Sequence, residues 1–197
     1  MAQPPEQPRR LVLASTSPYR KALLERLGLA FDVQSPGVDE SALRGEVPEQ
    51  TALRLSVLKA QAVRAPGALV IGSDQVASLD GRPLGKPGTH DKAARQLRRL
   101  SGRTAEFHTA VTVLDAASGE KHSRVVPCRV TFRDLDAATI DNYLRREQPY
   151  DCAGSAKAEG LGIALIARME TEDPTSLIGL PLIALTEMLA RAGLKVL

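Results

Sequence analysis

The chain has few of the residues that build disulfide frameworks or transition-metal sites. Its 197 residues include two cysteines and three histidines. Cys128 and Cys152 lie far apart and form no Cys-x-x-Cys redox pair, so we expect two free thiols. His90, His108 and His122 have no ligand spacing, which argues against a zinc site built from histidines. A metal, if the protein uses one, is expected to be a hard cation held by oxygen atoms.

Long apolar runs are also missing. No segment approaches the roughly 18 consecutive apolar residues that a membrane span needs. The proline-rich start, with Pro4, Pro5 and Pro8, lacks the apolar core of a secretory signal. We therefore expect a cytoplasmic protein, with a flexible tail over residues 1–10 and a single domain of two lobes around a cleft over residues 11–197.

The composition fits a globular protein with an anionic partner. Hydrophobic residues make up 43% and charged residues 25%, which leaves little room for extended disorder. The net charge of +3 favours a negatively charged ligand. Because lysine and arginine are spread along the chain, nucleic acid is an improbable partner and a small anion fits better.

The first ordered segment predicts an anion site. Residues 11–15 are typical of a strand, and a helix is expected over residues 18–27, with Ser17 as N-cap and Pro18 in the first turn. The amide groups and the positive dipole end of a helix start attract phosphate, and Arg20 lies in the same turn. The alternative is an ordinary capped helix after an ordinary strand.

The rest of the chain alternates strands with helices, which predicts a mixed α/β fold. Residues 68–72 are expected to form a buried strand that presents Ser73, Asp74 and Gln75 at its C-terminal end, where ligands bind in open α/β sheets. Asp80-Gly81 predicts a tight hairpin. Three further expectations are a helix after Pro48 that buries Leu53, Val57 and Ala60, a strand over 161–169, and a final helix from Pro181 that buries Leu182, Leu185, Met188 and Leu189.

Several charged residues stand where a purely structural sequence has little use for them. Each alone is more often a solvated charge. Together, three cations and three carboxylates are the parts needed to hold a polyphosphate, bind a divalent metal and activate water. The set comprises Arg20, Lys59, Lys86, Glu40, Asp74 and Glu159.

Seven short motifs resemble those of Maf-like nucleotide pyrophosphatases, in the same order. They are Ala-Ser-Thr-Ser-Pro-Tyr-Arg, Val-Asp-Glu, Gly-Ser-Asp-Gln, Gly-Lys-Pro, Leu-Ser-Gly, Cys-Ala-Gly-Ser-x-Lys-x-Glu-Gly and Ile-Gly-Leu-Pro-Leu. The match runs from about residue 10 to residue 195. It implies an elongated mixed sheet with surrounding helices and a central cleft, similar to inosine triphosphate pyrophosphatases.

The resemblance also implies a reaction. Members of this family hydrolyse a nucleoside triphosphate to a monophosphate and pyrophosphate with a divalent metal, Mg²⁺, Mn²⁺ or Co²⁺. By this resemblance Asp74 is the general base, and Glu40 with Asp74 holds the metal. The implied phosphate-binding residues are Ser15, Arg20, Lys59 and Lys86. A homodimer is the implied oligomeric state.

Three positions bear on the choice of base. Tyr19, Gln75 and Glu159 resemble the branch that hydrolyses 7-methyl-GTP, although Tyr19 stands where that branch often has tryptophan and Ala156 where an aromatic residue is common. Methylation makes the base cationic, so an aromatic face and a carboxylate both favour it. One alternative is a dTTP or UTP pyrophosphatase of the same family. Another is a nucleotide-binding regulator of septum formation without catalysis.

Overall fold

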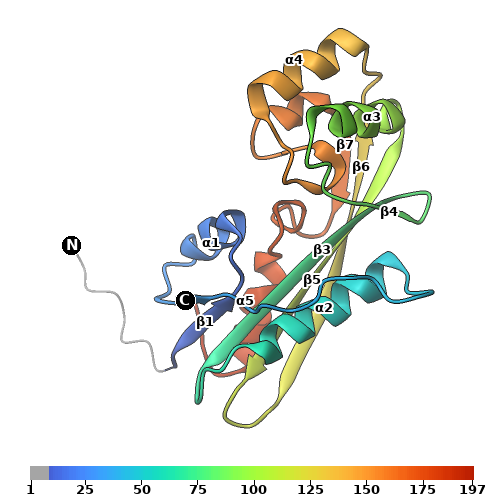
Figure 1. Ribbon diagram of the computed structural model, residues 1–197. Coiled ribbons are helices and arrows are strands. Elements are labelled where there is room, and N and C mark those ends of the chain that lie inside the picture. The colour runs from blue at the N-terminus through green and yellow to red at the C-terminus, as the bar shows by residue number, and fades with distance from the viewer. Residues whose placement is uncertain (1–8) are drawn as a thin grey trace. The chain divides into compact units, whose positions relative to one another are not determined.

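The computed structural model describes residues 9–197, which form a mixed sheet with α-helices around it (Figure 1). The strands are β1 (Leu11–Ala14), β2 (Asp32–Gln34), β3 (Leu69–Leu79), β4 (Arg82–Leu84), β5 (Thr104–Asp115), β6 (Lys121–Phe132) and β7 (Ile166–Thr171). The α-helices are α1 (Pro18–Glu25), α2 (Pro48–Ala62), α3 (His90–Leu100), α4 (Ala137–Glu147) and α5 (Leu182–Arg191). Short 3-10 segments are η1 (Ala153–Ser155), η2 (Leu161–Leu165) and η3 (Ser176–Ile178).

The sheet combines parallel and antiparallel pairs, which confirms the predicted mixed α/β class. Its strand order is β2-β1-β3-β5-β6-β7, and β4 pairs with β3. β1 runs parallel to β2 and β3, whereas the pairs β3–β4 and β6–β7 are antiparallel. A parallel pair requires a crossover, and the segment with α2 makes the crossover from β1 and β2 to β3.

The chain forms two compact units. Unit 1 comprises the described part of Met1–Gln75, together with Thr109–Val126 and Asp173–Leu197. Unit 2 comprises Val76–His108 and Pro127–Glu172. The strands β3, β5 and β6 each contribute residues to both units.

The core of unit 1 lies on both faces of the sheet. Leu11 and Leu13 of β1 pack in one cluster with residues of α1 and α5. Val12 and Ala14, which point to the opposite face, pack in a second cluster with Ala60 of α2. Because both faces are covered, β1 reads in the sequence as a continuous apolar run, as expected for a buried parallel strand.

Unit 2 contains the helix α3, which contacts both the helix α4 and the segment η1. Its hairpin between β3 and β4 turns through Asp80 and Gly81, whose φ angles are 52° and 71°. Positive φ at both central residues is the signature of the predicted two-residue turn. Helix α3 begins after Thr89, whose side chain accepts a hydrogen bond from the Lys92 amide.

Several details differ from the sequence-based expectations. Leu53 of α2 is exposed and Val57 is only half-buried, whereas Ala60 is buried as predicted. The buried face of the helix is the one that carries Ala52, Leu55, Ser56 and Ala60. Residues 161–165 form a 3-10 segment, so the expected strand over 161–169 begins only at Ile166. The strand predicted over 68–72 continues to Leu79, which places Asp74 within it and not at its end.

Part of the expected tail, residues 1–8, lies outside the described residues. Its last two residues are held by ion pairs: Arg9 with Asp115 at 2.7 Å and Arg10 with Asp32 at 2.7 Å. The Arg10 carbonyl also accepts a hydrogen bond from the Leu69 amide. Arg9 and Arg10, which were predicted to belong to the tail, are therefore attached to unit 1.

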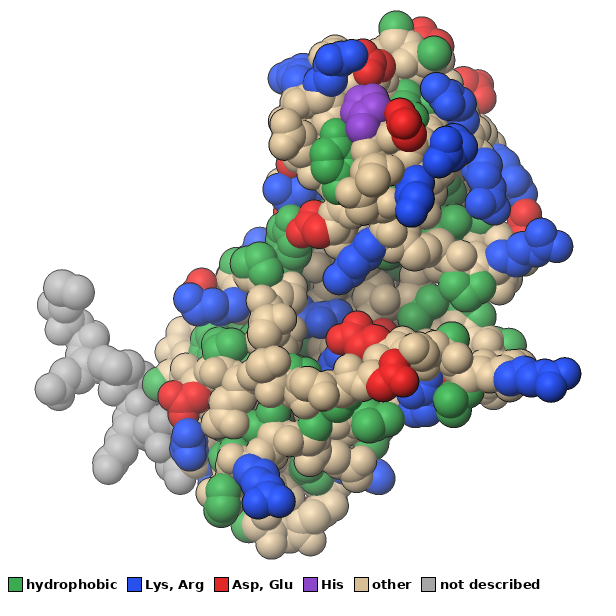
Figure 2. Space-filling model, in the orientation of Figure 1, with side chains coloured by type: hydrophobic (Ala, Val, Ile, Leu, Met, Phe, Trp, Pro, Cys, Tyr) green, Lys and Arg blue, Asp and Glu red, His purple; other side chains and the backbone are tan. Residues whose placement is uncertain are grey.

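The surface carries charges of both signs. On the face shown in Figure 2, lysine and arginine side chains lie among acidic and uncharged ones. Both cysteines are free thiols, as predicted, with Cys128 buried and Cys152 half-buried. Within residues 9–197, no helix has the length and apolar character that crossing a membrane requires.

Candidate functional site

The start of α1 forms as predicted from the sequence. Ser17 is the N-cap, and its side chain accepts a hydrogen bond from the Arg20 amide. Pro18 lies in the first turn, where its missing N–H costs no hydrogen bond. Ser15, at the end of β1, is buried, and its Oγ accepts hydrogen bonds from the Ser17 amide at 3.1 Å and from Arg20 Nη1 at 3.4 Å. The junction thus directs one guanidinium towards the turn.

A close approach between α2 and β3 brings a lysine to the sheet. A Cβ atom at Gly72 would lie 2.1 Å from the Ser56 carbonyl oxygen and 2.7 Å from the Ala60 amide. Only glycine therefore permits this spacing between the helix and the strand. Lys59 follows Ser56 by one helical turn, so the same contact places its side chain next to the strand residues that come after Gly72.

Lys59 is the centre of a small charge cluster. Its Nζ lies 2.6 Å from Asp74 Oδ1 and 2.8 Å from Glu40 Oε1. The Lys59 and Asp74 side chains are only 5% and 8% exposed, whereas Glu40 is 56% exposed. The two buried groups therefore form a charge-assisted hydrogen bond in a poorly hydrated environment, and Glu40 connects it to solvent.

Asp74 keeps one oxygen atom available. Among the described residues, only Oδ1 accepts a side-chain hydrogen bond, from Lys59. No buried side-chain oxygen or nitrogen of these residues is without a partner, so Oδ2 is reached by solvent. The parallel pairing of β1 with β3 ends at Leu13 and Ile71, and Asp74 lies beyond it. The carboxylate is thus fixed by one oxygen and open at the other.

Burial tunes the acidity of this carboxyl group. Desolvation raises the pKa of Asp74 above its ordinary value of 3.8, and the positive charges of Lys59 and Arg20 oppose this shift. Glu40 raises the pKa further because a second negative charge nearby disfavours ionisation. A carboxylate with a raised pKa is a stronger base than an exposed aspartate, which suits it to accept a proton from water.

Arg20 is held by the chain segment before α5. Its Nε donates to the Gly179 carbonyl at 2.9 Å. Burial lowers the pKa of Arg20, and the nearby charges of Asp74 and Glu40 counteract this effect. The guanidinium remains charged at neutral pH. With Nε held by a carbonyl, its two terminal nitrogens are directed to bind an oxyanion.

The Gln75 side chain is hydrogen-bonded to the same segment before α5 and to β5. Its Nε2 donates to Thr109 Oγ1 at 2.9 Å and to the Ser176 and Leu177 carbonyls, each at 3.0 Å. Sequence reasoning placed Ser73 beside the site but missed Thr109 and the 176–179 carbonyl oxygens as its neighbours. The Ile-Gly-Leu-Pro-Leu motif was a signal for this segment, but no pattern indicated that its backbone contacts Arg20 and Gln75.

Unit 1 therefore brings most of the predicted residues together. Lys59, Asp74 and Glu40 share ion pairs, and Arg20 interacts with Ser15. Tyr19 is half-buried in the first turn of α1. The specific roles of these residues stay predictions.

Two predicted residues belong to unit 2. Lys86 and Glu159 are both exposed, in the loop after β4 and in the loop between η1 and η2. Neither side chain forms a hydrogen bond or ion pair with another residue of the described chain. The Glu159 loop is itself anchored, since the Lys157 amide donates to the Tyr143 hydroxyl at 3.0 Å and the Lys157 ammonium pairs with Glu147.

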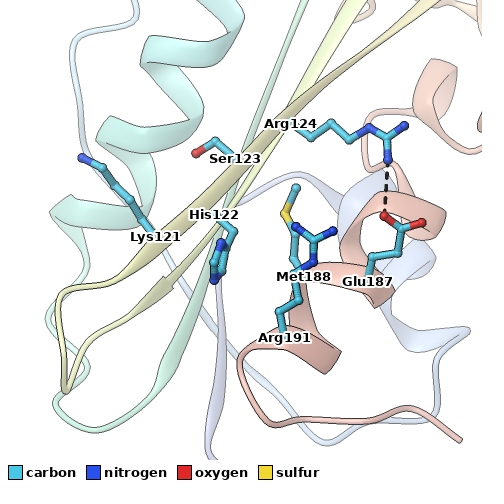
Figure 3. A pocket seen from close by; sticks show the side chains of 7 residues that line it. All are labelled: Lys121, His122, Ser123, Arg124, Glu187, Met188 and Arg191. Carbon is cyan, nitrogen blue, oxygen red and sulfur yellow. Dashed lines mark hydrogen bonds and ion pairs between the residues drawn. The ribbon is translucent and has the colours of Figure 1, made fainter.

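A cavity of about 280 Å³ in unit 1 involves none of the predicted residues. Residues 121–124 of β6 and Glu187, Met188 and Arg191 of α5 line it (Figure 3). Arg124 pairs with Glu187 at 3.3 Å and His122 lies 3.3 Å from Glu120. These carboxylates offset the basic groups, so the cavity is a weaker candidate than the Asp74 region.

The carboxylates near Lys59 fit a divalent metal in a limited way. No group of three or more histidine, cysteine or acidic side chains in residues 9–197 could hold a metal ion. Mg²⁺ is commonly bound by one or two carboxylates together with substrate phosphates. Asp74 and Glu40 match this smaller donor set, and both already lie within ion-pair distance of one ammonium group.

Cations beside a positioned carboxylate are groups that phosphoryl-transfer enzymes use to stabilise phosphate charge and to orient the attacking water. The Maf-like protein family model matches residues 10–192. This chain belongs to the Maf-like family.

Curated relatives match nearly the whole chain. A protein from Cupriavidus pinatubonensis named 7-methyl-GTP pyrophosphatase is 61% identical over 186 residues, which cover 93% of this chain and 94% of the relative. Proteins with the same name from Methylobacillus flagellatus and Bordetella pertussis are each 58% identical. The match with the Methylobacillus protein covers 95% of this chain and 98% of the relative, and the match with the Bordetella protein covers 96% of each.

Solved structures show a more distant likeness. The Staphylococcus aureus Ham1 protein has a TM-score of 0.45 and 18% sequence identity, and the match covers 64% of this chain and 73% of that chain. A HAM1 protein from Coxiella burnetii has a TM-score of 0.44 and 17% identity, and covers 63% and 73%.

Proposed function

We propose that the protein hydrolyses 7-methyl-GTP to 7-methyl-GMP and pyrophosphate and so clears a modified nucleotide. The observation that carries this proposal is the buried Asp74–Lys59 pair at 2.6 Å, with the second carboxylate oxygen open. The choice of substrate rests on relatives of that name at 58–61% identity. Hydrolase chemistry needs a base for water, and Asp74 supplies one.

In the proposed reaction Asp74 activates water. The carboxylate oxygen Oδ2 accepts a proton from the water as its oxygen bonds to the α-phosphorus. The bond from this phosphorus to the α,β-bridging oxygen breaks, and that oxygen leaves with pyrophosphate. Lys59 holds Oδ1 throughout, which fixes the orientation of the carboxylate. A general base in this position contributes about 10²–10⁴ to the rate.

The proposed phosphate contacts come from cations and from a helix start. Arg20 would bind a phosphate oxygen with its terminal nitrogens, because Gly179 already holds its Nε. The first turn of α1 and Ser15 supply further donors. Lys59 and Lys86 would offset negative charge that grows on the pyrophosphate leaving group.

A divalent cation, Mg²⁺, Mn²⁺ or Co²⁺, would be held by Asp74 and Glu40 together with substrate phosphates. When bound, it would neutralise phosphate charge and make water more acidic. The residues of the chain would still orient the nucleotide and accept the proton.

Recognition of the base is assigned to Tyr19, Gln75 and Glu159. A cationic ring over the Tyr19 face would gain roughly 0.5–2 kcal/mol, depending on desolvation. The Glu159 charge would favour the methylated base over neutral bases. We further infer a cytoplasmic location and a homodimer. Sedimentation of the purified protein would test the oligomeric state, and cell fractionation would test the location.

The test is pyrophosphate release by the purified protein with Mg²⁺. It compares 7-methyl-GTP, GTP, dTTP, UTP and CTP, with Asp74→Asn as the blank. A preference for 7-methyl-GTP that disappears in the variant supports reaction and base together. Preference for dTTP or UTP would keep the reaction and reject the base assignment. No turnover of any nucleotide would reject the proposed function.

A further inference from the structure

We propose that the segment from Asp173 to Pro181 is a positioning device that fixes Arg20 and Gln75 at once. This inference rests on the proposed function, because it concerns how the same site orients a phosphate-binding and a base-selecting side chain. The segment does so with backbone carbonyl groups, so its own side chains need not touch the ligand.

The segment is anchored to the start of α5. The N-cap residue Pro181 makes no side-chain capping hydrogen bond, which leaves the first amides of α5 in need of acceptors. Asp173 Oδ2 accepts from the Ile183 amide at 2.7 Å, and Thr175 Oγ1 accepts from the Leu182 amide at 2.8 Å. Asp173 Oδ1 in turn accepts from the Thr175 hydroxyl at 2.6 Å and from its amide at 3.0 Å. Asp173 is only 2% exposed, so solvent barely competes for these bonds.

The anchored segment presents the Gly179 carbonyl to Arg20. This oxygen accepts from Arg20 Nε and from Ser73 Oγ, both at 2.9 Å. Ser73 is fully buried, and its single hydroxyl hydrogen is shared between the Gly179 carbonyl and the Ala110 carbonyl, whose oxygen lies 2.8 Å from Oγ. Ser73, the neighbour of Asp74 on β3, therefore helps to hold the Gly179 carbonyl in place, and this carbonyl in turn orients the Arg20 guanidinium. Ser73 is a positioning residue for Arg20.

The same segment fixes which end of the Gln75 amide is free. Thr109 Oγ1 donates its hydrogen to the Ser176 carbonyl at 2.9 Å, so it can only accept from Gln75. Gln75 Nε2 consequently faces three acceptors. A flipped amide would place Oε1 against three oxygen atoms, which is repulsive. Oε1 makes no hydrogen bond within the described chain and is left as an acceptor for a ligand.

A free acceptor matches the base of the proposed substrate. The pairing edge of 7-methylguanine carries the adjacent donors N1–H and N2–H₂. Gln75 Oε1 can accept from this edge, whereas an unconstrained amide could turn its NH₂ group to suit other bases. Thr109 is therefore a positioning residue for base selection.

The experiment separates the two functions of the segment by kinetics. Thr109→Val should lower the ratio of kcat/KM for 7-methyl-GTP to that for UTP by roughly threefold to tenfold, the effect of one hydrogen bond. Thr109→Ser should restore the ratio. Ser73→Ala should raise KM for both nucleotides by a similar factor and leave the ratio unchanged. Asp173→Asn, which replaces one acceptor oxygen by an amide group, should produce both effects.

Thr112→Val is the matched control. Thr112 is on the same strand, is equally buried and also bonds two partners, Ser56 and Ser123. Partial unfolding would lower kcat for all nucleotides and leave the ratio of kcat/KM for 7-methyl-GTP to that for UTP unchanged. A lower ratio in Thr109→Val but not in Thr112→Val would therefore show that Thr109 positions Gln75. An unchanged ratio in Thr109→Val and Asp173→Asn would overturn the inference.

A second measurement keeps the inference testable if the proposed function fails. In ¹⁵N NMR spectra of the full protein, the Gln75 side-chain amide hydrogens should exchange slowly with solvent. Exchange should become at least several-fold faster in Thr109→Val and stay unchanged in Thr112→Val. Equal exchange in both variants would refute the network, whatever the protein hydrolyses.

Discussion

The two units place their predicted functional residues in opposite environments. In unit 1, Lys59 and Asp74 are nearly buried and bound to each other, and Arg20 and Gln75 are tied to backbone carbonyl groups. In unit 2, Lys86 and Glu159 are exposed and make no side-chain hydrogen bond within the described chain. Groups of the first kind are oriented by the fold, and groups of the second kind are not. Substitutions that break a buried contact in unit 1 should therefore affect stability as well as activity, and those of the exposed residues in unit 2 should affect activity alone.

The largest expected effect is on the rate. Asp74→Asn removes the proposed base while its amide oxygen can still accept from Lys59, so the fold should persist. We expect pyrophosphate release to fall by about 10²–10⁴. A melting curve with unchanged cooperativity is the control for folding. Retention of more than a tenth of the activity would assign the base to another group.

A pair of matched lysine substitutions tests the contrast between the units directly. Lys59→Met leaves the buried Asp74 carboxylate without its cation, and breaking a buried pair in this way costs about 3–5 kcal/mol. Lys86→Met removes an exposed charge and should change stability by less than about 0.5 kcal/mol. Urea denaturation of both variants at pH 7 measures the difference. Similar losses would mean that burial does not distinguish the two units.

The raised pKa of Asp74 gives activity and stability opposite responses to pH. Proton acceptance needs the ionised carboxylate, so kcat/KM should be lost as pH falls through a pKa above 3.8. For folding, the native state keeps this proton at pH values where the unfolded chain has lost it. The stability that Asp74 contributes is therefore lost as pH rises from 3.8 through the native pKa.

Two titrations check these signs. One follows kcat/KM of the protein against pH, and the other compares urea denaturation of the protein and of Asp74→Asn over the same range. A kinetic acid limb at or below 3.8 would contradict the effect of burial on Asp74.

The smallest expected effect belongs to unit 2. Glu159→Gln should reduce the preference for 7-methyl-GTP over GTP, because it removes one exposed negative charge. Interactions between exposed charges are worth about 0.2–1 kcal/mol, so the change should be about fivefold at most. Glu106→Gln, at an exposed glutamate of the same unit, is the control and should leave the preference intact. An equal change in both variants would indicate a general charge effect.

Much of the fold follows from local sequence signals. Ser17 and Pro18 predicted the start of α1, and Asp80-Gly81 predicted the hairpin, because both signals act through the backbone of the residues themselves. The inward face of α2 was predicted less well. Leu53 fits an apolar pattern, but the close approach at Gly72 turns the helix so that Ser56 and Ala60 meet the strand and Leu53 is exposed. This contact depends on a strand farther along the chain.

The sequence predicted which charged residues form the site, but it did not predict the hydrogen bonds that hold them. Lys59, Asp74 and Glu40 were identified as charged residues in unusual settings, and the structure joins them through one ammonium group. Thr109 and Asp173 gave no such signal. Thr109 donates to the backbone carbonyl of Ser176, and Asp173 accepts from the backbone amides of Thr175 and Ile183. A hydrogen bond to a backbone group carries no side-chain pattern in the sequence.

Gly72 shows how a residue without a charge can affect the pKa of Asp74. It has no side chain, and the 2.1 Å between its hypothetical Cβ and the Ser56 carbonyl means that even one methyl group would force α2 away from β3. Lys59 would travel with the helix and lengthen its contact to Asp74. The close contact between α2 and β3 thus helps to determine the pKa of Asp74. Alanine at position 72 would change that pKa without adding or removing a charge.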